Sequence, residues 1–219
     1  MADRGEAVRR LCDKGIIAVV RARSSKQLID VAKGLLAGGV DCIEITMTTP
    51  DALSVIRDCR AAVGEALIGV GSVLDAATAE AAIGAGAQYV VSPILNPEVI
   101  AAAHAADLPA IPGAFSPTEI WSATDAGADI VKVFPAGRFG PKYLKDLLAP
   151  LPHLKLSPTG GVNLETAAEW IAAGAVTLGI GSALVTKAAL AAGDVGEIER
   201  LAGEYVRIVA EARAATGGA

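Results

Sequence analysis

Short runs of β-branched and aliphatic residues alternate with longer alanine-rich stretches along the whole chain. The runs have the length of β-strands, and the stretches between them have the length of helices. Eight such runs occur, at residues 15–21, 42–46, 67–71, 88–92, 108–112, 129–134, 154–158 and 176–180. Repeated strand–helix units of this size predict a single α/β domain over residues 1–219, folded as a (β/α)8 TIM barrel. A doubly wound open sheet is the alternative arrangement.

Residues that cap helices mark several of the expected boundaries. Ser116 stands before a proline at the start of one helix, and Asn163 is the expected N-cap of another that stops near Gly174. Residues 3–13 are expected to form an extra N-terminal helix against the barrel. After the eighth strand, residues 183–215 are expected to be helical, with an amphipathic last segment.

Composition and charge exclude several classes of protein. Of the 219 residues, 53% are hydrophobic and 20% are charged, which is typical of a folded globular protein. The net charge of -5 and the lack of a basic run exclude a sequence-independent nucleic-acid binder. No apolar stretch has the roughly 18 residues of a membrane span, and the first residues do not resemble a signal peptide. A cytoplasmic protein that acts on small molecules is therefore expected.

The cysteines fit this location. Cys12, Cys42 and Cys59 show no paired spacing such as CxxC. Isolated cysteines of this kind are typical of reduced thiols in a cytoplasmic protein rather than of disulfides or a metal site.

A lysine in a strand that is otherwise built for burial is the most informative single residue. Lys132 lies in the run 129–134, and burial of an unpartnered ammonium group is unfavourable. Side chains two residues apart share a face of a strand, so Lys132 and Glu44 are both expected to point into the barrel mouth. The apolar residues beside them, such as Val131 and Ile43, then face the helices. A lysine and a carboxylate in one cavity form either a structural ion pair or a catalytic pair.

Two glycine-rich segments end the last two strands. Residues 157–163 read SPTGGVN and residues 179–184 read GIGSAL. In barrels, the loops after strands seven and eight commonly bind phosphate through backbone N–H groups. An amine, a carboxylate and an anion site at one barrel mouth indicate Schiff-base chemistry on a phosphorylated keto compound.

Seven motifs occur in this order between residues 15 and about 185: IEIT, GVGSVL, VSPILNPEVI, IPGAFSPTEI, VKVFPAG, SPTGGVN and GIGSALV. Together they resemble the 2-keto-3-deoxy-6-phosphogluconate (KDPG) aldolases. These class I aldolases are related to the 4-hydroxy-2-oxoglutarate (KHG) and 2-dehydro-3-deoxy-6-phosphogalactonate aldolases. The resemblance implies reversible cleavage of a 2-keto-3-deoxy sugar-acid phosphate to pyruvate and D-glyceraldehyde 3-phosphate. It also implies a homotrimer that needs no metal and no cofactor.

The resemblance assigns roles to individual residues. Lys132 in VKVFP corresponds to the Schiff-base lysine, and Glu44 in IEIT to the general acid/base. Ser72 stands where the family usually has threonine, which helps to hold the pyruvate carboxylate. Pro93 and Phe134 are implied to line the pocket around the imine. The residues implied to hold the carboxylate and phosphate ends of the substrate are Thr159, Gly160, Gly161, Gly181 and Ser182.

One position departs from the family pattern. Some members place arginine four residues after the catalytic glutamate, where it binds the substrate carboxylate, and here that residue is Thr48. Arg21 resembles the arginine that other branches have at the end of the first strand, so an anion-binding role is assigned to it. The two histidines, His104 and His153, are expected to face solvent rather than to bind a metal.

Three other functions fit parts of the pattern. The first is a 4-hydroxy-2-oxoglutarate aldolase that gives pyruvate and glyoxylate. The second is a phosphate-binding barrel epimerase, in which Glu44 and Lys132 act as acid and base without a covalent intermediate. The third is a non-catalytic sugar-phosphate sensor, which would bind its ligand without turnover.

Overall fold

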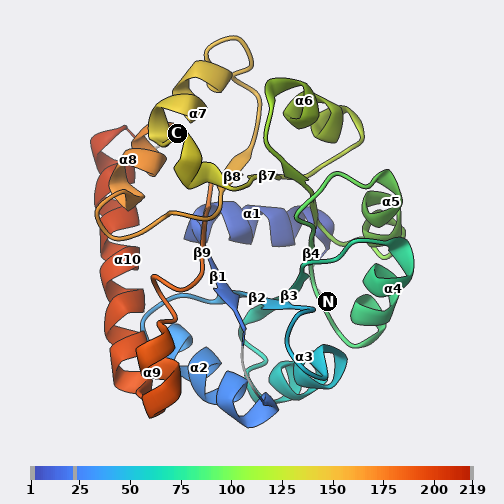
Figure 1. Cartoon of the computed structure of the whole chain (residues 1–219), viewed down its shortest axis with the longest axis vertical. Coiled ribbons are helices and arrows are strands. Elements are labelled where there is room, and N and C mark those ends of the chain that lie inside the picture. The colour runs from blue at the N-terminus through green and yellow to red at the C-terminus, as the bar shows by residue number, and fades with distance from the viewer. Residues whose placement is uncertain (1–2, 22–23, 218–219) are drawn as a thin grey trace.

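The computed structural model describes residues 3–21 and 24–217, and its strands all pair in parallel (Figure 1). The strands are β1 (Ile16–Val20), β2 (Cys42–Thr46), β3 (Leu67–Gly71), β4 (Val90–Val91), β5 (Ala110–Ile111), β6 (Gly113–Ala114), β7 (Val131–Val133), β8 (Leu156–Pro158) and β9 (Leu178–Ile180). A six-stranded sheet has the order β5-β4-β3-β2-β1-β9, and a three-stranded sheet has the order β6-β7-β8.

Helices surround these strands, so the fold is of the α/β class (Figure 1). The helices are α1 (Arg4–Lys14), α2 (Ser25–Ala37), α3 (Ala52–Ala62), α4 (Ala76–Gly84), α5 (Pro97–Ala105), α6 (Pro117–Asp125), the 3-10 helix η1 (Ala136–Arg138), α7 (Pro141–Leu148), α8 (Ala167–Ala172), α9 (Lys187–Ala192) and α10 (Val195–Ala215). No helix within the described ranges is long and apolar enough to cross a membrane.

Each of the eight predicted runs contains a strand, and two of them, β2 and β3, have the predicted bounds. The later strands are only two or three residues long. An apolar run does not distinguish residues that belong to a ladder from extended residues beside it, which explains the longer prediction. The apolar pattern did not predict β6, which follows β5 after the single residue Pro112. Proline has no N–H to donate to a ladder, so it interrupts the strand assignment there.

Two predicted helix boundaries need correction. Helix α8 begins at Ala167 with Thr166 at the N-cap position, not Asn163. The Asn163 side chain instead accepts a hydrogen bond of 3.0 Å from the Thr166 backbone N–H, which stabilises a turn before the helix. The predicted helix over 183–215 is two helices, α9 and α10, because Gly193 adopts a left-handed conformation between them. The predicted N-terminal helix is confirmed as α1.

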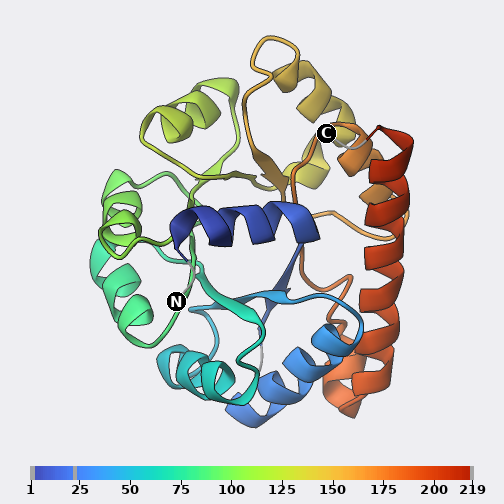
Figure 2. The ribbon, with the colours of Figure 1, turned by 180° about the vertical axis from the view of Figure 1, so that it is seen from behind.

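Apolar side chains form two clusters, one on each side of the strands. The larger cluster fills the space between the strands and the outer helices. The smaller one lies on the other face of the strands and is covered by α1, which crosses the amino-terminal side of the strands (Figure 2). Its buried members are Ala7, Leu11, Ile17, Cys42, Leu67, Tyr89, Val91, Ile111 and Ile130. Because Cys42 and Ile130 point inward, Glu44 and Lys132, two residues further along, point inward too.

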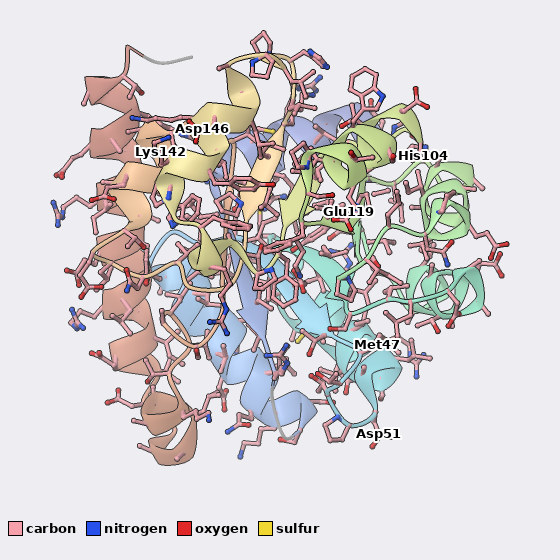
Figure 3. The ribbon with its side chains drawn as sticks, turned by 45° about the horizontal axis from the view of Figure 1, so that its top comes forward. Met47, Asp51, His104, Glu119, Lys142 and Asp146 are labelled. Carbon is pink, nitrogen blue, oxygen red and sulfur yellow. The ribbon has the colours of Figure 1, made fainter. Side chains whose placement is uncertain are left out.

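Helix α6 begins with a capping box that Ser116 and Glu119 form together. Glu119 is labelled in Figure 3. This capping box allows a test of how the stability of the fold depends on pH. The backbone N–H groups of Ser116 and Phe115 both donate to the Glu119 carboxylate. These hydrogen bonds lower the pKa of Glu119, and the bond from Ser116 has the larger effect. A lowered pKa stabilises the fold above the unfolded value of about 4.3, and this contribution disappears as pH falls through the folded pKa. Glu119→Ala should lower the free energy of unfolding by about 0.5 to 1 kcal/mol at pH 7.

Chemical denaturation at several pH values measures this contribution. The difference between Glu119→Ala and the native chain should shrink as the pH falls below about 4. Glu119→Gln is the matched variant, because an amide oxygen can still accept these hydrogen bonds but does not titrate. A difference that is independent of pH would contradict the assigned role of the carboxylate.

Candidate active site

Lys132 occupies the centre of β7 and its side chain is buried, with 7% of the residue exposed. Its backbone N–H donates to the carbonyl oxygen of Pro112 (2.9 Å), so the ladder fixes the direction of the side chain. The Nζ atom lies 3.9 Å from Oε1 of Glu44 and 5.3 Å from the centre of the Phe134 ring. The carboxylate and the aromatic face are therefore the electrostatic partners of this amine.

Glu44 lies on β2 and is the most buried charged residue of the site, with 2% exposed. Its Oε1 atom accepts no hydrogen bond from any residue that the structure describes. The distance of 3.9 Å between this oxygen and Nζ of Lys132 is short enough for an ion pair but too long for a hydrogen bond. A buried carboxylate oxygen without a donor is unfavourable, so this atom is available to take a proton or to bind a hydroxyl group of a ligand.

Gly71 on β3 makes the space that Glu44 occupies, and Gly69 makes space for the Tyr89 ring. A methyl group on Gly71 would collide with Oε1 of Glu44, and one on Gly69 would collide with the Tyr89 ring. Both glycines face the strand that carries Glu44, since Gly69 and Gly71 pair with Glu44 and Thr46. The missing side chains thus let the carboxylate lie against the neighbouring strand and be held beside Lys132.

Gly71→Ala should therefore lower activity without unfolding the chain. The added methyl group moves the end of one side chain, and a shift of about 1 Å in a catalytic group lowers the rate by about 10- to 100-fold. The measurement is kcat for the cleavage reaction proposed below, together with a thermal melt. Gly84→Ala is the control, because nothing lies within 4 Å of a methyl group at that position. Equal activity of the two variants would show that Glu44 need not lie where the structure places it.

One cavity of about 330 Å³ gathers the residues that the sequence singled out. All the predicted site residues line it: Arg21, Glu44, Ser72, Pro93, Lys132, Phe134, Thr159, Gly160, Gly161, Gly181 and Ser182. Five other lining residues were not predicted as site residues: Val19, Val162, Asn163, Gly179 and Ala183. Four of them lie in the glycine-rich segments 157–163 and 179–184, which the sequence had indicated as anion-binding loops, and Val19 lies two residues before Arg21.

The part of the cavity formed by the loops after β8 and β9 is suited to an anion. Gly160 and Gly161 have φ of 82° and 87°, a left-handed conformation that favours glycine. The backbone N–H groups of Gly161, Gly181 and Ser182 donate no hydrogen bond to any described residue. Such N–H groups beside a cavity can bind carboxylate or phosphate oxygens.

Arg21 is held at the edge of this cavity by Thr48. Its Nε donates to Oγ1 of Thr48 (3.2 Å), and Thr48 in turn lies 2.8 Å from Oγ1 of Thr46 on β2. The two threonines therefore orient the guanidinium group toward the cavity. The positive charge at the cavity edge thus comes from Arg21, which directly follows β1.

Ser72, directly after β3, has a φ of 61°, which is uncommon for a residue other than glycine. This conformation is still less favourable for a β-branched residue, so serine suits the backbone here better than threonine would. The serine hydroxyl remains available to the cavity.

The histidines lie away from this cavity, and one of them differs from expectation. His104 on α5 is half-buried, and its Nε2 lies 3.0 Å from Oδ2 of Asp129, so it does not simply face solvent (Figure 3). The sequence did not reveal that His104 on α5 lies beside Asp129, two residues before β7. His153 is exposed, as predicted. Within the described ranges, no group of three or more His, Cys, Asp and Glu side chains could hold a metal ion.

A parallel α/β fold that buries a lysine amine beside a carboxylate, at strand ends that also carry free backbone N–H groups, has the arrangement of enzymes that act through a lysine nucleophile. A family model described as KDPG and KHG aldolase matches residues 8–201. The chain belongs to this aldolase family, and it is an enzyme of the lyase class.

Individual relatives are similar to this chain over most of their own length. The 2-dehydro-3-deoxy-phosphogluconate aldolase of Treponema pallidum is 36% identical over 89% of this chain and 93% of its own. The 2-dehydro-3-deoxy-6-phosphogalactonate aldolase of Escherichia coli is 35% identical over 77% of this chain and 83% of its own. A solved KDPG aldolase of Legionella pneumophila, with pyruvate captured as a covalent carbinolamine intermediate, is 27% identical. It has a TM-score of 0.84 and covers 90% of this chain and 96% of its own.

Proposed function

We propose that the chain reversibly cleaves 2-keto-3-deoxy-6-phosphogluconate, or its galactonate epimer, to pyruvate and D-glyceraldehyde 3-phosphate. The observation that carries the proposal is the buried pair of Lys132 and Glu44, 3.9 Å apart in one cavity with free backbone N–H groups. The covalent pyruvate adduct of the Legionella relative supports the same chemistry for this chain.

In the first half of the reaction, the Lys132 amine attacks the C2 carbonyl carbon of the substrate. The proton that the Lys132 ammonium group loses before the attack passes to Glu44, and the proton left on the attacking nitrogen moves to the C2 oxygen, which gives a neutral carbinolamine. Loss of the C2 oxygen as water, with a further proton from Glu44, produces the protonated imine. The protonated imine nitrogen can then accept an electron pair from the adjacent carbon chain.

Carbon–carbon bond cleavage follows. The C4 hydroxyl group gives its proton to Glu44, and the C3–C4 electron pair moves toward the imine nitrogen. This releases D-glyceraldehyde 3-phosphate and leaves an enamine on Lys132. The enamine takes a proton at C3, and water then hydrolyses the resulting imine to pyruvate and free lysine. Glu44 can serve both proton transfers because its Oε1 has no donor among the described residues.

The remaining cavity residues hold the substrate in this scheme. Ser72 binds the carboxylate next to C2 through its hydroxyl group, and Pro93 and Phe134 form the apolar walls around the imine. Thr159 with Gly160 and Gly161, and Gly181 with Ser182, bind the charged ends through the loops after β8 and β9. Arg21 adds a positive charge at the edge of the cavity.

We also propose that residues 1–219 form one domain with a closed (β/α)8 barrel. Strands β5 and β6 would form one barrel strand interrupted at Pro112, which gives eight strand positions. A parallel bridge between Thr159 and Gly179 supports closure, because it links the ends of β8 and β9. The ring of strands in Figure 1 is consistent with this arrangement.

A homotrimer is the proposed assembly, in the cytoplasm. Several large apolar side chains are exposed, among them Leu74, Ile94, Trp121 and Phe139. Exposed side chains of this kind are typical of protein contact surfaces when they lie together. Analytical ultracentrifugation would measure the mass directly, and a monomer at micromolar concentration would contradict the trimer.

Pyruvate release, measured with a coupled lactate dehydrogenase assay, tests the proposed reaction. The two epimeric sugar-acid phosphates and 4-hydroxy-2-oxoglutarate are compared as substrates. We expect turnover of at least one epimer, with kcat/KM within the ordinary enzyme range of about 10⁴ to 10⁸ M⁻¹s⁻¹. Turnover of 4-hydroxy-2-oxoglutarate alone would favour the glyoxylate-forming alternative. Absence of pyruvate from all three would contradict the aldolase proposal and favour an epimerase or a sensor.

A further inference from the structure

Tyr89 is a fully buried tyrosine that takes no part in the proposed reaction steps. It directly precedes β4, and 0% of the residue is exposed. Its side chain belongs to the smaller apolar cluster, which α1 covers (Figure 2). Tyr89 does not line the catalytic cavity. Its hydroxyl group has no hydrogen-bond partner among the residues that the structure describes.

The Tyr89 ring and the Glu44 carboxylate lie side by side along β3. A methyl group on Gly69 would collide with the tyrosine ring, and a methyl group on Gly71 would collide with Oε1 of Glu44. Gly69 and Gly71 are two residues apart, so they face the same side of the strand at a separation of about 7 Å. The aromatic ring and the carboxylate therefore occupy adjacent places on one strand, and the carboxylate is the one that reaches the catalytic cavity.

The hydroxyl group of Tyr89 lies on the side of the ring that faces β2, the strand that carries Glu44. Burial is the main cause that raises the pKa of Tyr89 well above its usual range. Electrostatic repulsion from Cys42, Glu44 and Asp41 adds to this rise, and all three residues lie on β2 or directly before it. The hydroxyl group thus keeps its proton at neutral pH and can donate a hydrogen bond.

Two buried polar atoms without partners therefore lie close to each other, one a donor and the other an acceptor. The Lys132 ammonium group is 3.9 Å from Oε1 of Glu44, so that oxygen still needs a donor. The thiol of Cys42 points to Asp41 (3.5 Å) and not to the Tyr89 hydroxyl group. A small rotation of the glutamate side chain, or one bridging water, joins the hydroxyl group and the carboxylate. Leaving both groups unpaired would be unfavourable.

We propose that Tyr89 is a positioning residue whose hydroxyl group donates to Glu44 and holds the carboxylate in place for its proton transfers. The inference rests on the proposed function, in which Glu44 moves protons at C2 and C4 of the substrate. Lys132 cannot hold the carboxylate through the whole cycle, because its nitrogen becomes part of the carbinolamine, the imine and the enamine. A donor that does not react keeps the carboxylate in one position through these steps.

Tyr89→Phe tests the proposal, because it removes one oxygen atom and keeps the aromatic ring. We expect kcat for the cleavage reaction to fall about tenfold, which corresponds to the loss of one hydrogen bond to a charged group. KM should stay within about twofold, since Tyr89 does not line the cavity. A thermal melt should show a stable fold, because phenylalanine fills the same space and leaves no buried donor unpaired.

Combining Tyr89→Phe with Glu44→Gln shows whether the tyrosine acts through the glutamate. In the Glu44→Gln background, Tyr89→Phe should change the residual kcat by less than about twofold, because the amide transfers no protons for the hydroxyl group to assist. A further tenfold loss in that background would overturn the inference. Native kcat for Tyr89→Phe alone would overturn it as well.

Tyr205→Phe is the matched control. Tyr205 on α10 is also fully buried and its hydroxyl group also lacks a partner among the described residues, but it belongs to the larger apolar cluster. Its kcat should stay within about twofold of the native value, and a loss equal to that of Tyr89→Phe would overturn the inference. Absence of pyruvate release from the native chain would reject the proposed function itself, whereas an active native chain with an equally active Tyr89→Phe variant rejects the inference alone.

Discussion

Lys132→Met is expected to lower kcat for aldol cleavage by at least about 10⁴-fold, because the variant has no amine to form the imine. Methionine has a similar length and suits the apolar surroundings of β7, so the loss should reflect chemistry and not packing. Steady-state pyruvate release measures kcat. Substrate binding should persist, since the anion-binding loops after β8 and β9 are unchanged, and isothermal titration calorimetry would detect it.

A lysine outside the cavity provides the matched control. Lys155→Met replaces an exposed lysine just before β8 and should keep kcat within about twofold of the native value. Because Lys132→Met leaves Glu44 buried without its ionic partner, circular dichroism must show that this variant is folded. Substantial cleavage by folded Lys132→Met would mean that the imine forms elsewhere or not at all.

Glu44→Gln is expected to lower kcat by about 10²- to 10⁴-fold, the usual range for loss of a general acid/base. The amide has nearly the same shape as the carboxylate and fits the space beside Gly71. It cannot exchange protons with the carbinolamine or the C4 hydroxyl group.

The same variant distinguishes proton transfer from binding. Glu44→Gln should still form the imine with pyruvate, although more slowly, since Lys132 is intact. Glu80→Gln on α4 removes an exposed carboxylate and is the control for net charge. A Glu44→Gln variant with native kcat would assign the proton transfers to another group and leave Glu44 a structural partner of the lysine.

The sequence predicted that Lys132 and Glu44 point to the same side of the strands, because strand alternation is a local property. Lys132 and Glu44 each follow an inward-facing residue two positions earlier, Ile130 and Cys42, and the apolar pattern shows which face is which. The rule that barrel chemistry lies at strand ends then brought both residues to one cavity. Neither step depends on a contact between distant parts of the chain.

Features that depend on such contacts could not be predicted. Thr48 appeared only as a missing arginine, but in the structure its hydroxyl accepts a hydrogen bond from Arg21, on another strand. His104 was expected to be exposed because the sequence does not show that Asp129 lies beside it. Predicting these contacts requires the tertiary arrangement of residues that lie far apart in the sequence.

The central claim is that Lys132 forms a covalent imine with a keto acid. Intact-protein mass spectrometry after incubation with pyruvate and sodium borohydride tests it most directly. Reduction of the imine should add one pyruvate-derived group to the native chain, at Lys132 in a peptide map, and none to Lys132→Met. Native chain that is folded but carries no adduct, or an equal adduct on Lys132→Met, would contradict the claim.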